Sequence, residues 1–138
     1  KPQKNGNTDF VEKVIEKAKS FGVEDKLFIS SFDSGILNKV KEIDSGIKTG
    51  YLYPSMGEIV KRKLFSPLPV AKKCKADFIL PHHGYVSKNL INKAHALGIK
   101  VGVWTVNKIE CVEKLVKIGV DGIITDVPDI IKNKVESI

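Results

Sequence analysis

Five short apolar segments recur at a nearly constant spacing along the chain. Successive segments start 22, 29, 23 and 21 residues apart, at Leu27, Thr49, Phe78, Val101 and Gly122. This spacing is the length of one strand, one helix and two short loops. Strands that are apolar on both faces are typical of a parallel sheet covered by helices. The spacing therefore predicts five strand-helix units in one α/β domain.

The segments between these strands have the apolar periodicity of helices. We expect the helices at about residues 8–22, 33–43, 56–65, 87–97, 109–118 and 128–135. The sequence SPLPV at 66–70 is expected to break the third of them, because each proline removes an amide donor and restricts the residue before it.

Two architectures contain tandem strand-helix units: an open doubly wound sheet and a (β/α)8 TIM barrel. No glycine-rich phosphate loop follows any of the five strands, which favours the barrel. A complete barrel has eight units in about 250 residues. A chain of 138 residues with five units is therefore expected to form only part of a barrel.

The basic charge of the chain does not indicate a nucleic-acid partner. The formal net charge is +7, but only one of the 23 basic residues is an arginine, and the lysines alternate with glutamates along the helices. Proteins that recognise nucleic-acid bases favour arginine, whose guanidinium group can form two parallel hydrogen bonds to a base edge. Lysines that alternate with glutamates are instead typical of a solvent-exposed helix surface. The dense lysine patches at 61–63 and 72–75 are expected in surface loops.

Cysteine usage and hydropathy bear on the compartment of the chain. Cys74 and Cys111 are far apart in sequence and lie at no metal-ligand spacing, so we expect two reduced thiols and a cytoplasmic location. No apolar run approaches the roughly 20 residues of a membrane helix. An upstream signal or membrane segment stays an open alternative.

Four motifs follow one another in a characteristic order. They are ISSFD at 29–33, PHHG at 81–84, AHALGIKVGVWTVN at 94–107 and GVDGIITDVPD at 119–129. In order and spacing they resemble the C-terminal half of the glycerophosphodiester phosphodiesterase family. The resemblance implies that residues 1–138 are the C-terminal portion of a TIM-barrel domain, with about strands 4–8 of the barrel.

The same resemblance implies the reaction and its cofactor. The family hydrolyses glycerophosphodiesters to glycerol 3-phosphate and an alcohol with a divalent metal, calcium or magnesium. Two catalytic histidines, an acidic metal-binding pair and a Glu-x-Lys motif precede the matched segment in the family. Lys1, followed by Pro2, matches the last residue of that motif.

The match at Lys1 has two consequences. It implies that the Lys1 ammonium is catalytic, because a phosphodiester transition state gathers negative charge. It also implies that the metal ligands lie upstream of Lys1, so the chain alone is expected to be inactive. Five strands leave two open sheet edges, which we expect to pair with the missing N-terminal half or with another copy of the chain.

Two aromatic residues at strand ends are candidates for substrate binding. Trp104 shares a strand face with Gly102, and Phe32 shares one with Ser30. On each face the small residue comes first and the aromatic ring lies next to it, nearer the mouth of the barrel. We expect the rings to form an apolar wall for the glycerol portion of the substrate, with ordinary filling of the barrel core as the alternative.

His82 is the third candidate for substrate binding. By strand parity, only one of His82 and His83 faces the barrel, and the resemblance favours His82. A hydrogen-bonded loop histidine is the alternative. His95 lies within a helix and is expected to pack or cap rather than to act on substrate.

The carboxylates at the strand ends give no metal site, and we assign no metal ligand. Asp77 and Asp121 precede their strands, at the end of a barrel that carries stability rather than catalysis. Asp126 follows a strand and is expected to cap the next helix.

Three functions are compatible with these observations. The first is a metal-dependent phosphodiesterase of which this chain is one part. The second is a binding or regulatory barrel without catalysis. The third is an unrelated phosphate-binding barrel that uses the backbone amides of the TDVPD loop at 125–129.

Overall fold

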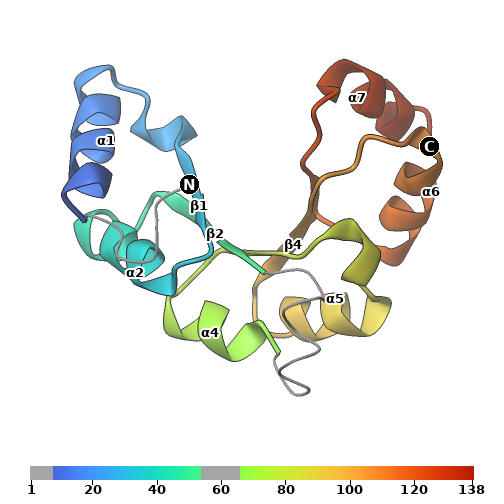
Figure 1. Cartoon of the computed structure of the whole chain (residues 1–138), viewed down its shortest axis with the longest axis horizontal. Helices are drawn as coiled ribbons and strands as arrows, with labels where there is room; N and C mark the ends of the chain where they lie inside the picture. The colour runs from blue at the N-terminus through green and yellow to red at the C-terminus, as the bar shows by residue number, and fades with distance from the viewer. Residues whose placement is uncertain (1–7, 54–65) are drawn as a thin grey trace. The chain divides into compact units, whose positions relative to one another are not determined.

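The computed structural model describes residues 8–53 and 66–138 (Figure 1). Their contacts divide them into two units, residues 8–52 with 66–78 and residue 53 with 79–138. The strand order is β1-β2-β3-β4-β5, which confirms the predicted α/β class. The elements are α1 (Thr8–Ser20), η1 (Glu24–Lys26), β1 (Phe28–Ser31), α2 (Ser34–Ile43), β2 (Lys48–Leu52), α4 (Leu68–Lys73), β3 (Phe78–Leu80), η2 (His83–Tyr85), α5 (Lys88–His95), β4 (Lys100–Val103), α6 (Ile109–Ile118), β5 (Gly122–Ile123) and α7 (Pro128–Glu136).

The first unit packs α1 and α2 against a parallel strand pair. β1 and β2 are in register from the pair Phe28 and Lys48 onward. The buried core of this unit combines both helices with the chain before β2, and Ile29 of β1 packs against it; its buried members are Val11, Ile15, Ile36, Val40 and Ile47. Because successive strand residues point to opposite faces, Phe28 lies on the face away from these helices, where it is 43% exposed.

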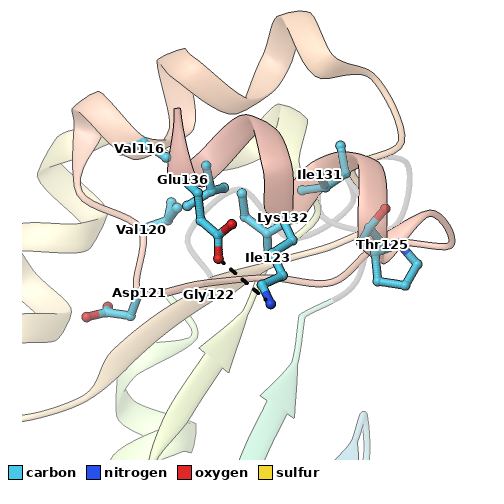
Figure 2. A pocket seen from close by; sticks show the side chains of 11 residues that line it. Val116, Val120, Asp121, Gly122, Ile123, Thr125, Ile131, Lys132 and Glu136 are labelled. Carbon is cyan, nitrogen blue, oxygen red and sulfur yellow. Dashed lines mark ion pairs between the residues drawn. The ribbon is translucent and has the colours of Figure 1, made fainter. Parts of the chain in front are cut away.

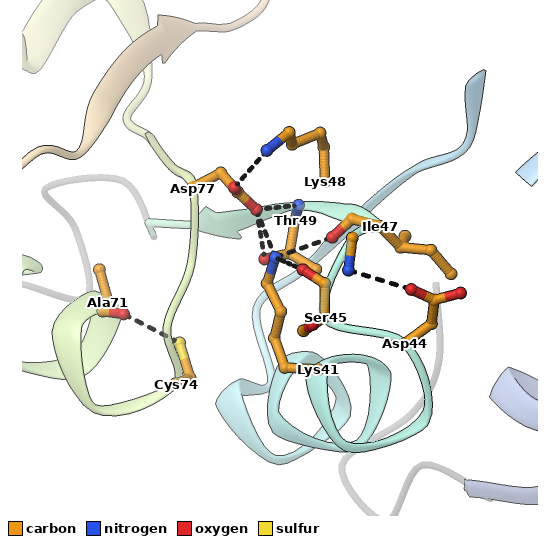
Figure 3. A network of polar contacts seen from close by, with 10 residues as sticks. Lys41, Asp44, Ser45, Ile47, Lys48, Thr49, Ala71, Cys74 and Asp77 are labelled. Carbon is orange, nitrogen blue, oxygen red and sulfur yellow. Dashed lines mark hydrogen bonds and ion pairs between the residues drawn. The ribbon is translucent and has the colours of Figure 1, made fainter. Parts of the chain in front are cut away.

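Asp77 is the centre of a polar network before β3 in the first unit (Figure 3). Its Oδ2 accepts from Lys41 Nζ at 2.7 Å and from the buried backbone N–H of Thr49 at 2.8 Å, while Oδ1 accepts from Lys48 Nζ at 3.2 Å. Burial raises the pKa of this carboxyl, but these hydrogen bonds outweigh burial and hold the pKa below its ordinary value. The network ties the start of β2 to the residue that precedes β3.

The second unit has its core between β4, α6 and α7. β4 and β5 are parallel, with Gly102 opposite Gly122. α6 and α7 lie side by side (Figure 1). The buried members of the core are Val103, Val106, Val112, Leu115 and Ile131.

Helix ends in both units follow local sequence signals. The Asp33 side chain caps α2 by accepting from Gly35 N at 2.7 Å, and the Ser87 hydroxyl caps α5 by accepting from Leu90 N at 3.3 Å. α6 ends at Gly119, whose φ of 92° lies in the left-handed region that glycine adopts without strain.

The structure corrects the sequence prediction at three places. The prolines of SPLPV do not prevent a helix: α4 begins directly after Pro67, its N-cap, and Pro69 lies in its first turn. A proline is tolerated there because the N–H groups of the first turn have no intrahelical partner. Lys72 and Lys73 therefore end a helix instead of lying in a loop. The last strand is shorter than the predicted GIITD, with only two residues in β5. The predicted helix at 56–65 lies outside the described residues.

Within the described part of the chain, none of the helices combines the length and apolar character that crossing a bilayer would need.

Candidate functional site

His82 and Trp104 lie side by side where β3 and β4 end in the second unit. The two residues form an isolated parallel bridge. The backbone N–H of Trp104 donates to Pro81 O at 3.2 Å, and that of His83 donates to Trp104 O at 2.8 Å. The ladder between the two strands thus continues past their ends. It fixes both side chains at the carboxyl ends of adjacent parallel strands, the end where such folds bind ligands.

The Trp104 side chain is held in one orientation. Its Nε1–H donates to Leu80 O at 2.7 Å. Its ring lies edge-on to the His82 ring, with centroids 5.6 Å apart and planes at 84°. Because the indole N–H is used by the backbone, this side chain can offer a ligand its ring surface but no hydrogen-bond donor.

The two ring nitrogens of His82 have different hydrogen-bonding roles. Its Nδ1 accepts from Gly84 N at 3.1 Å, as the cap of the η2 turn. In the neutral ring Nδ1 therefore carries no proton, and Nε2 is the donor. No described residue bonds Nε2. The ring can thus donate one hydrogen bond to a ligand.

The structure adds two side chains to this site that sequence reasoning missed. The His83 ring stacks on the His82 ring, with centroids 4.4 Å apart, and the Tyr85 ring lies 5.5 Å from His82. Strand parity fails for His83 because this residue already begins the η2 turn. Burial lowers the pKa of His83, and the neighbouring His82 and Lys108 lower it further. A neutral ring is therefore favoured at position 83.

The loops after β4 and β5 are joined by Asn107. Its Oδ1 accepts from Thr125 Oγ1 at 3.1 Å and from Asp126 N at 3.0 Å, and its Nδ2 donates to Asp126 Oδ2 at 2.7 Å. The prediction that Asp126 caps the last helix is wrong, since the N-cap of α7 is Val127 and no side chain caps it. Asp126 instead bonds across to the preceding loop, a contact that local sequence patterns do not reveal.

Phe32 and Lys1 remain as the other predicted site residues. Phe32 directly follows β1 in the first unit and is 40% exposed, while its neighbour Ser31 is buried. Lys1 lies outside the described residues. The prediction that Phe32 and Trp104 share one pocket stays a prediction.

The described residues do not by themselves fit a divalent metal. No three of their histidine, cysteine, aspartate and glutamate side chains are grouped as a metal site would require. The two aspartates that follow strands are already engaged, Asp33 with Gly35 N and Asp126 with Asn107.

His95, which was predicted to have a structural role, contacts Asp121 at the amino ends of β4 and β5. Its Nε2 lies 2.7 Å from Asp121 Oδ2, which also accepts from the backbone N–H of Val101 at 2.7 Å. Burial raises the pKa of Asp121, but the bonds from Val101 and His95 outweigh burial and lower it. His95 thus acts at the end of the strands away from Trp104.

Comparison with known proteins places these observations in a family. The chain is 33% identical over 124 residues to a glycerophosphodiester phosphodiesterase of Caldanaerobacter subterraneus subsp. tengcongensis, a match that covers 90% of this chain and 48% of the relative. The chain spans about half the length of the curated relatives it matches.

Solved structures agree with the fold. A glycerophosphodiester phosphodiesterase from Parabacteroides distasonis superposes with a TM-score of 0.76 at 19% identity, covering 94% of this chain and 51% of that one. An Oleispira antarctica phosphodiesterase, solved with sn-glycerol-3-phosphate, gives 0.64 at 21% identity, covering 80% and 42%. The sequence model of the glycerophosphoryl diester phosphodiesterase family matches residues 2–130 of the chain. With nearly its whole length matched, the chain belongs to this family.

Proposed function

We propose that this chain is the C-terminal part of a glycerophosphodiester phosphodiesterase barrel. The complete barrel would hydrolyse glycerophosphodiesters: water adds to phosphorus, the bond to the alcohol oxygen breaks, and glycerol 3-phosphate and the alcohol leave. Family membership and the name of the Caldanaerobacter relative support this reaction. The observation that carries the proposal for this chain is the His82 and Trp104 pair at the carboxyl ends of β3 and β4.

In this proposal Trp104 binds the three-carbon glycerol portion of the substrate. An indole whose N–H is held by Leu80 O presents an apolar surface to a ligand. Phe32, exposed after β1, would add a second apolar surface in the complete barrel. Both residues act on substrate affinity rather than on bond cleavage.

His82 is proposed to donate a hydrogen bond from Nε2 to a hydroxyl or phosphate oxygen of the substrate. The bond from Gly84 N to Nδ1 holds the ring in the orientation that leaves Nε2 as the donor. The His83 ring, whose lowered pKa favours its neutral form, stacks on the His82 ring and supports this orientation.

We assign the chemical step to groups outside the described residues. Lys1 is proposed to meet the negative charge of the transition state as an ammonium. The divalent metal, calcium or magnesium, is proposed to bind to carboxylates supplied by the remaining part of the barrel, because the described carboxylates do not fit it. No step of the reaction is therefore assigned to a metal ligand of this chain.

The partner and the compartment are part of the same proposal. The open sheet is completed by the remaining part of the barrel. Cys74 and Cys111 are both free thiols, which supports a reducing, cytoplasmic compartment.

The two competing functions differ in their support. A non-catalytic binding barrel would keep the His82 and Trp104 pair and lack turnover, so an activity measurement decides it. A phosphate site at the TDVPD loop needs backbone amides that are available to an anion. The Asp126 amide already donates to Asn107 Oδ1, and the Val127 amide donates to Thr125 Oγ1 at 3.1 Å, which disfavours that site.

The test of the proposal is hydrolysis of glycerophosphocholine by a complete barrel that contains this chain. We expect turnover that a chelator abolishes, and none from the 138-residue chain alone. Trp104→Ala should raise KM about tenfold with little change in kcat, which corresponds to a loss of about 1.4 kcal/mol of binding free energy. Trp104→Phe is the matched control and should retain most of the affinity, because it keeps an apolar ring.

Two results would contradict the proposal. Chelator-resistant turnover by the 138-residue chain would place the chemistry within it. A complete, folded barrel without turnover would favour the non-catalytic binding function.

A further inference from the structure

Trp104 and Ile124 lie on the same face of the sheet, where β4 and β5 end. Ile123 packs into the core beside α6 and α7, and Figure 2 shows it with Ile131 in the lining of a hollow of about 400 Å³. Because successive strand residues point to opposite faces, Ile124 points away from these helices. Trp104 points away from them as well, since Val103 belongs to the same core as Ile123.

The strand register places Ile124 opposite Trp104. Gly102 pairs with Gly122, and the backbone N–H of Ile124 donates to Val103 O at 2.8 Å, which continues the ladder past β5. A Cβ at Gly122 would meet only Gly102 Cα, at 4.0 Å. The sheet face just below Trp104 and Ile124 therefore carries no side chain from either strand, and Ile124 is 42% exposed.

Beyond Ile124, side-chain hydrogen bonds hold the chain that follows β5. The backbone N–H of Val106 still donates to Ile124 O at 3.0 Å. Thr125 Oγ1 and the Asp126 N–H then donate to Asn107 Oδ1, at 3.1 and 3.0 Å, and Asn107 Nδ2 donates to Asp126 Oδ2 at 2.7 Å. One side chain thus makes three bonds to the two residues that follow Ile124.

The contacts of Asn107 require an amide at this position. The backbone N–H of Asp126 can only donate, and its ionised carboxylate can only accept, so the side chain between them must offer both an acceptor and a donor. An aspartate at position 107 would bring two carboxylates into contact. Because these bonds are exposed to water, they contribute little to global stability, and their main effect is on how the two loops lie.

We infer that Asn107 is a positioning residue for substrate binding; this inference rests on the proposed function. By holding the end of β5 against the end of β4, Asn107 keeps the Ile124 side chain beside Trp104. The glycerol portion of the substrate then meets two apolar side chains instead of one. Asn107 touches no reacting atom, so its loss lowers substrate affinity and leaves bond cleavage unchanged.

The experiment measures glycerophosphocholine hydrolysis by a complete barrel that contains this chain. Asn107→Asp should raise KM about fivefold with kcat unchanged, because the carboxylates at 107 and 126 repel each other and separate the loops. Asn92→Asp, the same change at an exposed residue of α5, is the matched control and should leave both constants unchanged. A purely structural loss would instead reduce the folded fraction, which lowers the apparent kcat and leaves KM unchanged.

A double variant tests the three bonds directly. Asn107→Asp combined with Asp126→Asn exchanges the donor and the acceptor between the two side chains. The new carboxylate can still accept from Thr125 Oγ1 and from the backbone N–H of residue 126, and the new amide can donate to it. We expect the double variant to return KM to within about twofold of the unsubstituted value.

The role of Ile124 is tested by removing its side chain. Ile124→Ala should raise KM about fivefold with kcat unchanged, since the substrate loses one apolar contact. In the Ile124→Ala background, Asn107→Asp should raise KM by less than about twofold more, because the side chain that Asn107 positions is gone.

Three results would overturn the inference: an unchanged KM in Asn107→Asp, no recovery in the double variant, or effects of Asn107→Asp and Ile124→Ala that multiply. A complete, folded barrel without turnover would contradict the proposed function instead. In that case calorimetric titration with sn-glycerol 3-phosphate tests the inference on the same variants. The same order of affinities would support it, whereas equal affinities or no binding would overturn it.

Discussion

The two ends of the strands use their polar side chains differently. Before β3 and β5, Asp77 and Asp121 each accept hydrogen bonds from a buried backbone amide and from basic side chains. After β3 and β4, the His82 and Trp104 rings are fixed by the backbone, and His82 Nε2 bonds no described residue. The amino ends therefore hold the strands in register, whereas the carboxyl ends of β3 and β4 keep a hydrogen-bonding group for a ligand.

The two amino-end networks also differ from each other. The Lys41 side chain beside Asp77 is 10% exposed, whereas the His95 side chain beside Asp121 is 42% exposed. A hydrogen bond to a buried cation contributes more than one to an exposed group, which water screens. We therefore expect Asp77 to contribute more to stability than Asp121.

The largest expected effect is that of Asp77→Ala. This change leaves the buried Thr49 amide without its acceptor and removes an anion from Lys41 and Lys48. We expect the free energy of unfolding to fall by about 2–4 kcal/mol, measured by urea titration. Asp25→Ala, at an exposed aspartate of η1, is the control and should change it by less than about 0.5 kcal/mol. Equal effects of the two variants would contradict the prediction that the hydrogen bonds of Asp77 stabilise the fold.

A smaller loss is expected from Asp121→Ala. The buried Val101 amide loses its acceptor, but the other partner, His95, is exposed to water. The expected loss is about 1–2 kcal/mol in the same titration. His95→Ala should cost less than Asp121→Ala, since it leaves the bond to Val101 intact. The reverse order would show that the ion pair, not the backbone bond, dominates this network.

The smallest expected effect is on the pH dependence of stability. The folded pKa of Asp77 is lowered, so below the ordinary aspartate pKa of about 3.9 the unfolded chain binds more protons than the folded one. The contribution of Asp77 is therefore complete above that pH and is lost as the pH falls through the folded pKa. Asp77→Asn should reduce the acid loss of stability by up to about 1 kcal/mol, measured by urea titrations at neutral and acid pH. An unchanged acid profile would contradict the assignment.

The sequence predicted those features that depend on local patterns. Strand parity places Val103 in the core of the second unit, opposite the face of Gly102 and Trp104. The Ser87 cap was likewise predictable, because it depends on residues close in sequence. The position of Asp121 before its strand indicated a structural role, which its bond to Val101 N supports.

The features that the sequence did not predict depend on residues far apart or on departures from a regular strand. Asp126 had a local helix-capping pattern, but its partner Asn107 lies 19 residues earlier in the chain. The stacking of His83 on His82 arises because the chain leaves the strand between them and the next residues form a turn. α4 was missed because the two prolines of SPLPV were interpreted as helix breakers rather than as the N-cap and a first-turn residue of a helix.

The most direct test of ligand binding at the carboxyl ends uses the fluorescence of Trp104, the only tryptophan of the chain. A complete barrel that contains this chain and no other tryptophan is titrated with sn-glycerol 3-phosphate, with His82→Ala and His95→Ala as matched variants at the two ends of the strands. We predict a saturable change in emission for the unsubstituted chain and for His95→Ala. For His82→Ala, the affinity obtained from the titration should be at least tenfold weaker. No change in the unsubstituted chain, or an equal response in all three proteins, would contradict a glycerophosphate site at His82 and Trp104.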